Sequence, residues 1–213
     1  MSRIVVIGGH GKVALHLGRI LTNCGDEVTS VFRNPDHTDD VAATGARSVV
    51  ADIETLDIAA LGELLAGHDA VVFSAGAGGG NPTRTYAVDR DAAIRVIDAA
   101  AQAGVRRFVM VSYFGARPDH GVAEDNPFFH YAEAKAAADA HLRASDLDWT
   151  VLAPGRLTLQ PATGRIAVGA GNEVTREDVA LVAAAVLHND STIGRTIEFN
   201  NGDLPITEAL AAR

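Results

Sequence analysis

Tyr131 and Lys135, in the stretch FHYAEAKAAADAHL, are the two residues whose types and spacing most directly suggest chemistry. They are four positions apart, so on a helix their side chains project from one face, one turn apart. A lysine ammonium beside a phenol favours the phenolate and lowers a pKa that starts at about 10. Such a tyrosine can pass a proton to or from a carbonyl or alcohol oxygen while a hydride is transferred. The spacing therefore predicts an acid–base pair; the alternative is a surface tyrosine and lysine without a catalytic role.

Three glycines near the start of the chain have the spacing of a diphosphate-binding loop. Gly8, Gly9 and Gly11 follow the apolar run 4–7 and directly precede an amphipathic stretch. Glycine lets backbone N–H groups approach a ligand closely, and a helix start adds unpaired N–H groups and the positive end of its dipole. The pattern, Gly8-x-x-Gly11-x-x-Ala14, departs from the usual G-x-G-x-x-G. We predict a dinucleotide site that includes Gly8, Gly9, His10, Gly11, Lys12 and Val13; the alternative is a tight turn without a ligand.

The residue that ends the second apolar run bears on which dinucleotide binds. An NAD site usually has Asp or Glu at this position, where the carboxylate accepts hydrogen bonds from the adenosine ribose. In the stretch EVTSVFRNP the position is held by Arg33. A guanidinium suits a 2′-phosphate through charge-assisted hydrogen bonds, and Lys12 and His10 could add positive charge. The sequence therefore favours NADP(H), with NAD(H) possible; a solvated arginine at a strand end is the alternative.

Strand-like and helix-like segments alternate along the whole chain. Ala14, Leu17, Gly18 and Leu21 share one helical face, and a second such stripe ends at Gly104. Apolar strands that alternate with helices are typical of a parallel sheet covered on both faces. The strand candidates are residues 3–7, 27–32, 48–51, 70–74, 107–111, 150–152 and 196–199. We expect one Rossmann-type, doubly wound domain over residues 1–213. It has a mostly parallel sheet of six or seven strands and a small substrate-side segment from about residue 154.

Composition excludes several classes of protein. The 213 residues carry a formal net charge of −9, which argues against a general nucleic-acid or anionic-membrane surface. Cys24 is the only cysteine, so no intrachain disulfide or cysteine metal cluster can form, and the histidines lack metal-ligand spacing. No apolar run approaches the roughly 20 residues that span a bilayer. We expect a cytoplasmic monomer or homodimer that binds a small-molecule substrate.

The motifs together resemble the atypical short-chain dehydrogenase/reductase family. They are most similar to its small NAD(P)H-binding members, the NmrA-like regulators and the biliverdin/flavin-reductase-like enzymes. The segments that carry the resemblance are GGHGKVA, FRNP, GARSVVADIE, DAVVFSAGAG, AGVRRFVMVSYFGA, YAEAK, WTVLAPGRLT and REDVA. The resemblance implies a cofactor that lies across the carboxyl edge of the sheet. Asp52 and Ile53 would lie beside the adenine, and Ser74, Ala75 and Gly76 along the ribose and phosphate path. Lys135 would hold the nicotinamide ribose, and Pro154, Gly155 and Leu157 would flank the nicotinamide.

The resemblance also implies a substrate-binding hydroxyl after the fifth strand, where relatives commonly have a Ser or Thr pair. Here the pair is Ser112-Tyr113. Ser112 could take the role, Tyr113 could take it, or the role could be lost. No counterpart is found for the Asn that completes the tetrad in many relatives. Phe128 and Phe129, next to Tyr131, are expected to form an apolar wall for the substrate.

These expectations favour an NADP(H)-dependent oxidoreductase that acts on a small carbonyl, alcohol or reducible heterocycle, with Tyr131 as proton donor. Two alternatives remain. One is a redox sensor that binds the dinucleotide without turnover, as NmrA-like proteins do. The other is an epimerase or isomerase that retains its cofactor, a reading weakened by the short segment available for a substrate domain.

Overall fold

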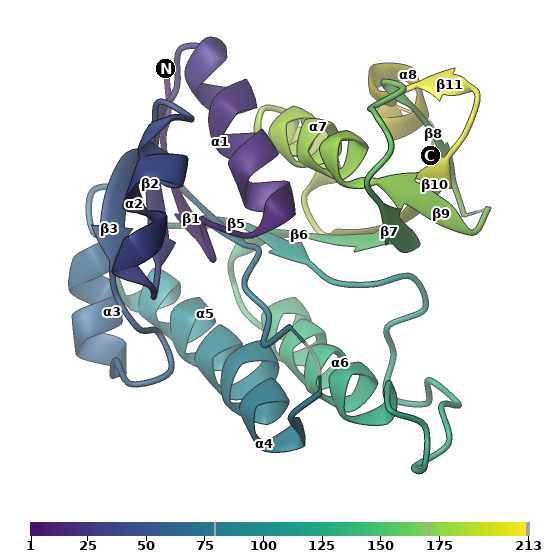
Figure 1. The fold of residues 1–213 in the computed structure, drawn as a ribbon, viewed down its shortest axis with the longest axis horizontal. Coiled ribbons are helices and arrows are strands. Elements are labelled where there is room, and N and C mark those ends of the chain that lie inside the picture. The colour runs from purple at the N-terminus through teal and green to yellow at the C-terminus, as the bar shows by residue number, and fades with distance from the viewer. Residues whose placement is uncertain (79, 170, 212–213) are drawn as a thin grey trace.

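Short runs of β-branched and aromatic residues form a nine-stranded sheet in the computed structural model, which describes residues 1–78, 80–169 and 171–211 (Figure 1). Seven strands are parallel, in the order β3-β2-β1-β4-β5-β6-β10. Their bounds are β1 Arg3–Ile7, β2 Glu27–Phe32, β3 Arg47–Val50, β4 Ala70–Phe73, β5 Arg107–Val111, β6 Asp148–Pro154 and β10 Arg195–Asn201. These are the seven strands predicted from the sequence, so the mostly parallel α/β sheet is confirmed.

Two short antiparallel strands extend the sheet beyond β10, and the sequence did not predict them. They are β8, Arg165–Val168, and β11, Leu204–Pro205. A separate parallel pair joins β7, Arg156–Thr158, to β9, Glu173–Thr175. All four strands have four residues or fewer. Their pairing is decided by the surface on which they pack and not by a local sequence pattern.

Different helices cover the two faces of the sheet (Figure 1). Alternate residues of β1 point to opposite faces, so Ile4 and Val6 belong to one hydrophobic core and Val5 and Ile7 to the other. The first face carries α1 Lys12–Asn23, α2 Thr38–Ala42, α7 Arg176–Leu187 and α8 Ile206–Ala211. The second carries α3 Ile58–Leu65, α4 Pro82–Thr85, α5 Ala93–Gln102 and α6 Phe129–Arg143.

Three further short helical segments link these elements: η1 Pro35–His37, the π-helix η2 Tyr86–Ala92, and η3 Asp190–Thr192.

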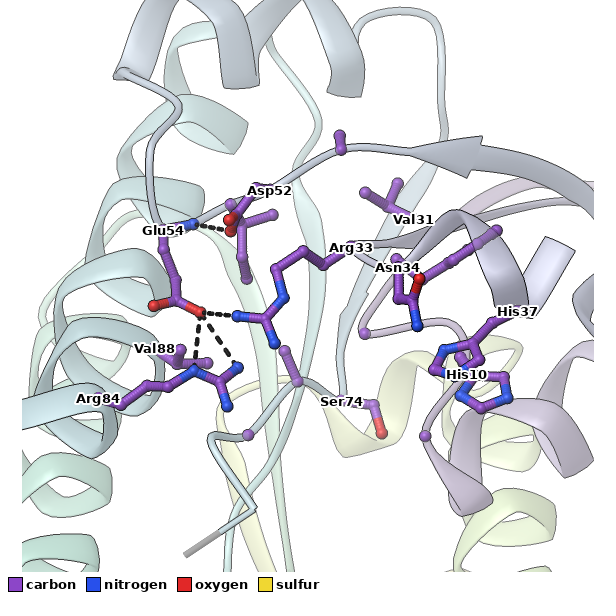
Figure 2. A pocket seen from close by; sticks show the side chains of 17 residues that line it. His10, Val31, Arg33, Asn34, His37, Asp52, Glu54, Ser74, Arg84 and Val88 are labelled. Carbon is purple, nitrogen blue, oxygen red and sulfur yellow. Dashed lines mark hydrogen bonds and ion pairs between the residues drawn. The ribbon is translucent and has the colours of Figure 1, made fainter. Parts of the chain in front are cut away.

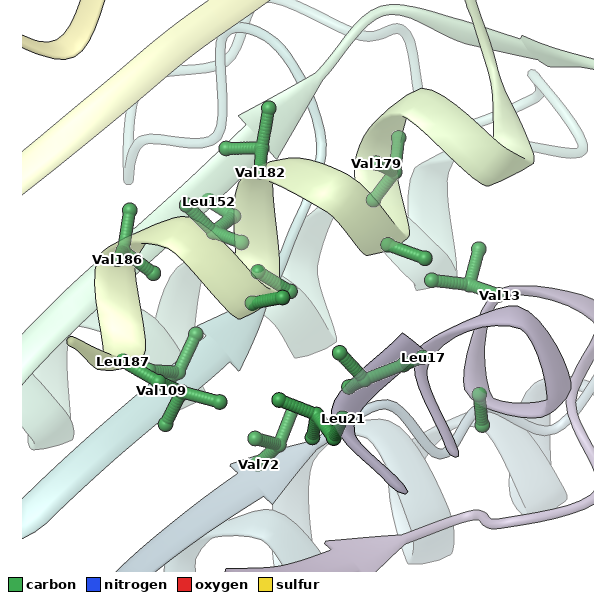
Figure 3. Packing of buried hydrophobic residues seen from close by; sticks show 14 of the residues in the cluster. Val13, Leu17, Leu21, Val72, Val109, Leu152, Val179, Val182, Val186 and Leu187 are labelled. Atoms are coloured by element: carbon green, nitrogen blue, oxygen red, sulfur yellow. The ribbon is translucent and has the colours of Figure 1, made fainter. Parts of the chain in front are cut away.

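On the first face, Leu17 and Leu21 of α1 and Val182 of α7 pack over the central strands (Figure 3). This contact places the start of α1 at the carboxyl edge of the sheet. No helix among the described residues is long and apolar enough to cross a bilayer.

Helix α7 begins at a buried polar junction. Thr175 Oγ1 accepts a hydrogen bond from the Asp178 amide at 2.9 Å, which caps the helix. The Asp178 carboxylate in turn accepts from the amides of Thr163 and Gly164, at 3.0 and 2.8 Å. Asp178 is fully buried. One side chain therefore joins the first turn of α7 to the turn that precedes β8.

We expect Asp178→Ala to lower the free energy of unfolding by about 2–3 kcal/mol, because the Thr163 and Gly164 amides lose their acceptor and the buried carboxylate that joins the two turns is gone. Urea denaturation followed by circular dichroism measures the change. Glu177→Ala is the matched control, since Glu177 occupies the same turn but has a side chain 41% exposed. Equal stability of the two variants would show that the carboxylate of Asp178 does not hold the junction.

Candidate functional site

The predicted site residues follow the strands at one edge of the sheet. Because the seven strands are parallel, their carboxyl ends lie along the same edge. The chain moves from β1 outward to β2 and β3, then returns to β4 on the other side of β1. A reversal of strand order of this kind opens a crevice at the carboxyl ends, where doubly wound proteins bind ligands. The fold thus places the glycine loop, which follows β1, at the centre of that edge.

The first two glycines of the loop are required by close packing. Gly8 has φ +86°, a conformation that favours glycine, and a Cβ there would lie 2.5 Å from Ala75 Cα. A Cβ on Gly9 would lie 2.5 Å from Ser30 Cβ. Both distances are shorter than any ordinary carbon contact. The loop therefore lies directly against the segment after β4 and against β2, and a side chain at either position would displace it.

The amide groups of the glycines themselves bond within the protein. The Gly8 and Gly9 amides donate to the Val31 carbonyl at 2.9 and 2.8 Å, and the Gly11 amide donates to the Gly8 carbonyl at 2.8 Å. The turn uses these donors to keep its own shape. Gly11 is the N-cap of α1, so the amides of Lys12 and Val13 are in the first turn, where N–H groups have no partner within the helix. An anion at the start of α1 would therefore meet amides of this first turn and not those of the glycines.

A cavity of about 260 Å³ lies beside this loop (Figure 2). Nine of the predicted cofactor residues line it: Gly8, His10, Gly11, Arg33, Asp52, Ile53, Ser74, Ala75 and Gly76. Gly9, Lys12 and Val13 are near in sequence but are not part of its wall. The structure therefore brings together residues from the ends of four strands, β1 to β4.

Arg33 lies in this cavity with partners that the sequence did not suggest. Its guanidinium pairs with Glu54 Oε1 at 2.9 Å, and Arg84 pairs with the same oxygen at 3.1 Å (Figure 2). The Arg33 side chain is 51% exposed. Glu54 and Arg84 lie 21 and 30 positions from their partners, so no local pattern could have found them. Two guanidinium groups therefore converge on one carboxylate oxygen in the wall of the cavity.

A second cavity, of about 530 Å³, lies further along the same edge, beyond β5, β6 and β10. The predicted residues in its wall are Ser112, Tyr113, Tyr131, Pro154, Gly155 and Leu157. Three rings form one side: Tyr113 and Phe128 have centroids 5.0 Å apart, and both contact Tyr131 at 5.6 and 5.2 Å. Phe128 lines this cavity as expected, whereas Phe129 packs against His120. Asn172 and Asn200 also line it, and the sequence analysis missed both.

Lys135 lies one turn after Tyr131 on α6, as the spacing predicts, but its surroundings are different from those expected. The side chain is buried, and Nζ lies 3.3 Å from Met110 Sδ. Burial lowers the pKa of Lys135, and the nearby carboxylates Asp139 and Asp89 oppose that shift. Lys135 is not part of the wall of either cavity.

The expected lowering of the Tyr131 pKa by Lys135 is wrong for the protein without a ligand. Burial of the phenol raises the pKa of Tyr131, and the charges of Asp89 and Asp139 raise it further. Burial and the two carboxylates both act in the direction opposite to the one expected from Lys135. Tyr131 is therefore a neutral phenol at ordinary pH, the form that donates a proton.

Asp89 and Asp139 are the main residues that the sequence analysis missed. Asp139 Oδ2 accepts a 2.5 Å hydrogen bond from Ser112 Oγ, and Asp89 Oδ2 accepts one of 3.0 Å from the Ala77 amide. Burial raises the pKa of both carboxyl groups. Asp139 follows Lys135 by four positions, so the helical period could have found it. Asp89 could not be found in this way, because it lies in the π-helix η2, whose turn is wider than that of an α-helix.

Comparison with known proteins gives consistent matches. The family model described as NAD(P)H-binding matches residues 8–190. The uncharacterized sugar epimerase YhfK of Bacillus subtilis is 34% identical, with 98% of each chain covered. A Bacillus halodurans structure, provisionally named an NAD-dependent epimerase/dehydratase, is 36% identical with a TM-score of 0.90 and covers 99% of each chain. The oxidoreductase ylbE of Lactococcus lactis is 28% identical with a TM-score of 0.87, over 98% of this chain and 94% of that one.

The raised pKa of Tyr131 gives a prediction for the protein without a ligand. We expect the phenolate absorbance of the wild type and of Tyr131→Phe to rise equally up to a pH of about 10, the ordinary pKa of tyrosine, because Tyr131 remains neutral there. A spectrophotometric pH titration of the folded proteins measures this. A phenolate step below that pH that disappears in the variant would contradict the assignment.

Proposed function

The chain belongs to the NAD(P)H-binding family, and from this membership we propose that it is an NADP(H)-dependent oxidoreductase. Its reaction would transfer a hydride to or from a small carbonyl, alcohol or reducible heterocycle. The observation that carries the proposal is the succession of two cavities along one sheet edge, the first after β1–β4 and the second after β5, β6 and β10. A dinucleotide laid across this edge would have its adenosine in the first cavity and its nicotinamide beside the second.

The residues of the first cavity fit such a cofactor. At Gly8 and Gly9 the loop lies too close to its neighbours for these two positions to carry a side chain. The amides of Lys12 and Val13 lie at the start of a helix whose dipole favours an anion. Arg33 and Arg84 offer guanidinium groups to a 2′-phosphate. The chemical nature of these donors therefore supports a phosphorylated dinucleotide.

The residues of the second cavity fit proton transfer to a substrate oxygen. NADP(H), when bound, supplies or accepts the hydride. Tyr131, held as a neutral phenol, would donate its proton to the oxygen of a carbonyl substrate during reduction. Lys135 would support this step through its charge, with Asp89 and Asp139 balancing that charge in the buried interior.

Tyr113 is the better candidate for the second hydroxyl that binds the substrate. Ser112 has one hydroxyl hydrogen, and it is donated to Asp139. The Tyr113 hydroxyl is buried and makes no hydrogen bond with any residue in the described part of the chain. Its ring contacts that of Tyr131 in the same cavity. We therefore assign the substrate-oxygen contact to Tyr113 and a positioning role to Ser112.

Epimerisation with a retained cofactor is the second candidate, because two similar proteins carry epimerase names. The three aromatic rings in the wall of the second cavity favour reduction of a flat or apolar molecule over handling of a sugar, whose hydroxyls need many polar partners. Incubation with substrate and catalytic NADP⁺ separates the two functions, since only an oxidoreductase produces net change in the dinucleotide.

We expect Arg33→Ala to weaken NADPH binding about tenfold or more and to leave NADH binding nearly unchanged, because a charge-assisted bond to the 2′-phosphate is lost. Fluorescence titration with the two reduced dinucleotides measures both affinities. Arg90→Ala is the control, since Arg90 is 40% exposed and pairs with Asp91 away from the cavity. Unchanged selectivity in the Arg33 variant would remove this residue from cofactor recognition.

We expect Tyr131→Phe to lose turnover by about a hundredfold or more while binding of the dinucleotide persists, because only the proton donor is removed. NADPH oxidation across quinones, aldehydes and flavins provides the assay. Tyr86→Phe is the matched control, since Tyr86 bonds His130 and lines neither cavity. Full turnover in Tyr131→Phe would exclude the proposed donor, and binding without any turnover in the wild type would favour the redox-sensor function.

A further inference from the structure

Two histidines form part of the wall of the first cavity. His10 lies in the glycine loop and His37 in η1, and their rings stack with centroids 3.5 Å apart and planes 14° apart. His10 Nε2 lies 3.1 Å from Asp40 Oδ2. Figure 2 shows the pair across the cavity from Glu54 and Arg84, with Arg33 between them. Neither the glycine-loop pattern nor the strand-end arginine predicts a stacked pair of imidazoles.

The permanent charges of the cavity wall balance one another. Among the described residues that line it, Arg33 and Arg84 are positive and Asp52 and Glu54 are negative. Both guanidinium groups already pair with Glu54. A phosphate monoester carries about −1.5 to −2 charges near neutral pH, so its arrival would leave negative charge in excess. Imidazole is the side chain whose charge rises by proton uptake in this pH range.

We propose that His10 and His37 determine the preference for NADP(H), by taking up one proton as the 2′-phosphate binds. This inference rests on the proposed function, and it adds two residues and a proton to cofactor recognition. Two charged rings stacked at 3.5 Å would repel, so the pair takes up no more than one proton on binding, and His10, 3.1 Å from Asp40, has a carboxylate beside it to accept a hydrogen bond. Binding of the phosphate and of the proton then strengthen each other reciprocally.

Other charged groups surround the pair and must be included in the balance. They come from the loop, from η1 and α2, and from the cavity wall: Lys12, Asp36, Asp39, Asp40, Arg33, Asp52, Glu54 and Arg84. The carboxylates of η1 and α2 favour a charged imidazole, while Lys12 and the two arginines oppose it. A phosphate that binds between the arginines and the histidines shifts that balance toward the protonated pair.

The number of protons taken up on binding tests this proposal directly. Calorimetric titration of the whole protein with NADP⁺ and with NAD⁺, in buffers of different ionisation enthalpy, measures that number. In slightly acidic buffer we expect more protons to be taken up with NADP⁺ than with NAD⁺. A phosphate that merely loses its own second proton near the arginines would give the opposite sign, namely proton release.

His37→Asn and His10→Asn, made separately, should each abolish the difference in proton uptake. They should also lower the preference for NADP⁺ over NAD⁺ by about three- to tenfold in the same buffer, as loss of one charge near a phosphate would. His188→Asn is the matched control: His188 also pairs with an aspartate, Asp26 at 2.9 Å, but lies outside the first cavity. The control should retain both the uptake and the preference.

The outcomes separate this inference from the proposed function. If proton uptake is the same with both dinucleotides, the 2′-phosphate does not cause it. That result would overturn the role of His10 and His37 in the preference for NADP(H). An uptake difference that survives in both histidine variants would overturn it as well. Binding of neither dinucleotide would instead overturn the proposed function. A circular dichroism spectrum unchanged from that of the wild type confirms that each variant is folded.

Discussion

The close approach of the glycine loop to its neighbours is the constraint on which the site depends. A Cβ on Gly8 would lie 2.5 Å from Ala75 Cα, and one on Gly9 would lie 2.5 Å from Ser30 Cβ. Because the loop lies so near, its glycine amides bond to Val31 and Gly8, and α1 begins with unpaired N–H groups at the carboxyl edge. A single packing arrangement thus forms one wall of the cavity and aims the helix that would receive the diphosphate.

A buried lysine and two carboxylates lie close to Tyr131, the tyrosine in the wall of the second cavity. Lys135 lies in the interior with Asp89 and Asp139 as the nearest opposing charges, and burial disfavours the charged form of all three groups. Burial of the phenol, together with the charges of Asp89 and Asp139, keeps Tyr131 protonated.

Local patterns were sufficient to predict the parallel strands but not the electrostatic partners. A parallel strand that is buried on both faces, such as β4, consists of apolar residues throughout. Composition alone is therefore sufficient to predict it. Nine predicted cofactor residues meet in one cavity because they follow strands whose ends must be adjacent. Glu54 and Arg84, in contrast, meet Arg33 only through tertiary packing. The short strands β8 and β11 likewise depend on a surface that exists only once β10 is in place.

The brevity of β11 has a consequence for association between copies of the chain. This strand forms the outer border of the sheet and consists of Leu204 and Pro205 alone. Proline has no amide hydrogen to give to an incoming strand, and two residues provide almost no ladder on which to dock. Edge-to-edge extension of the nine-stranded sheet is therefore disfavoured on this side, whereas the opposite border at β3 has four residues with which a strand could pair.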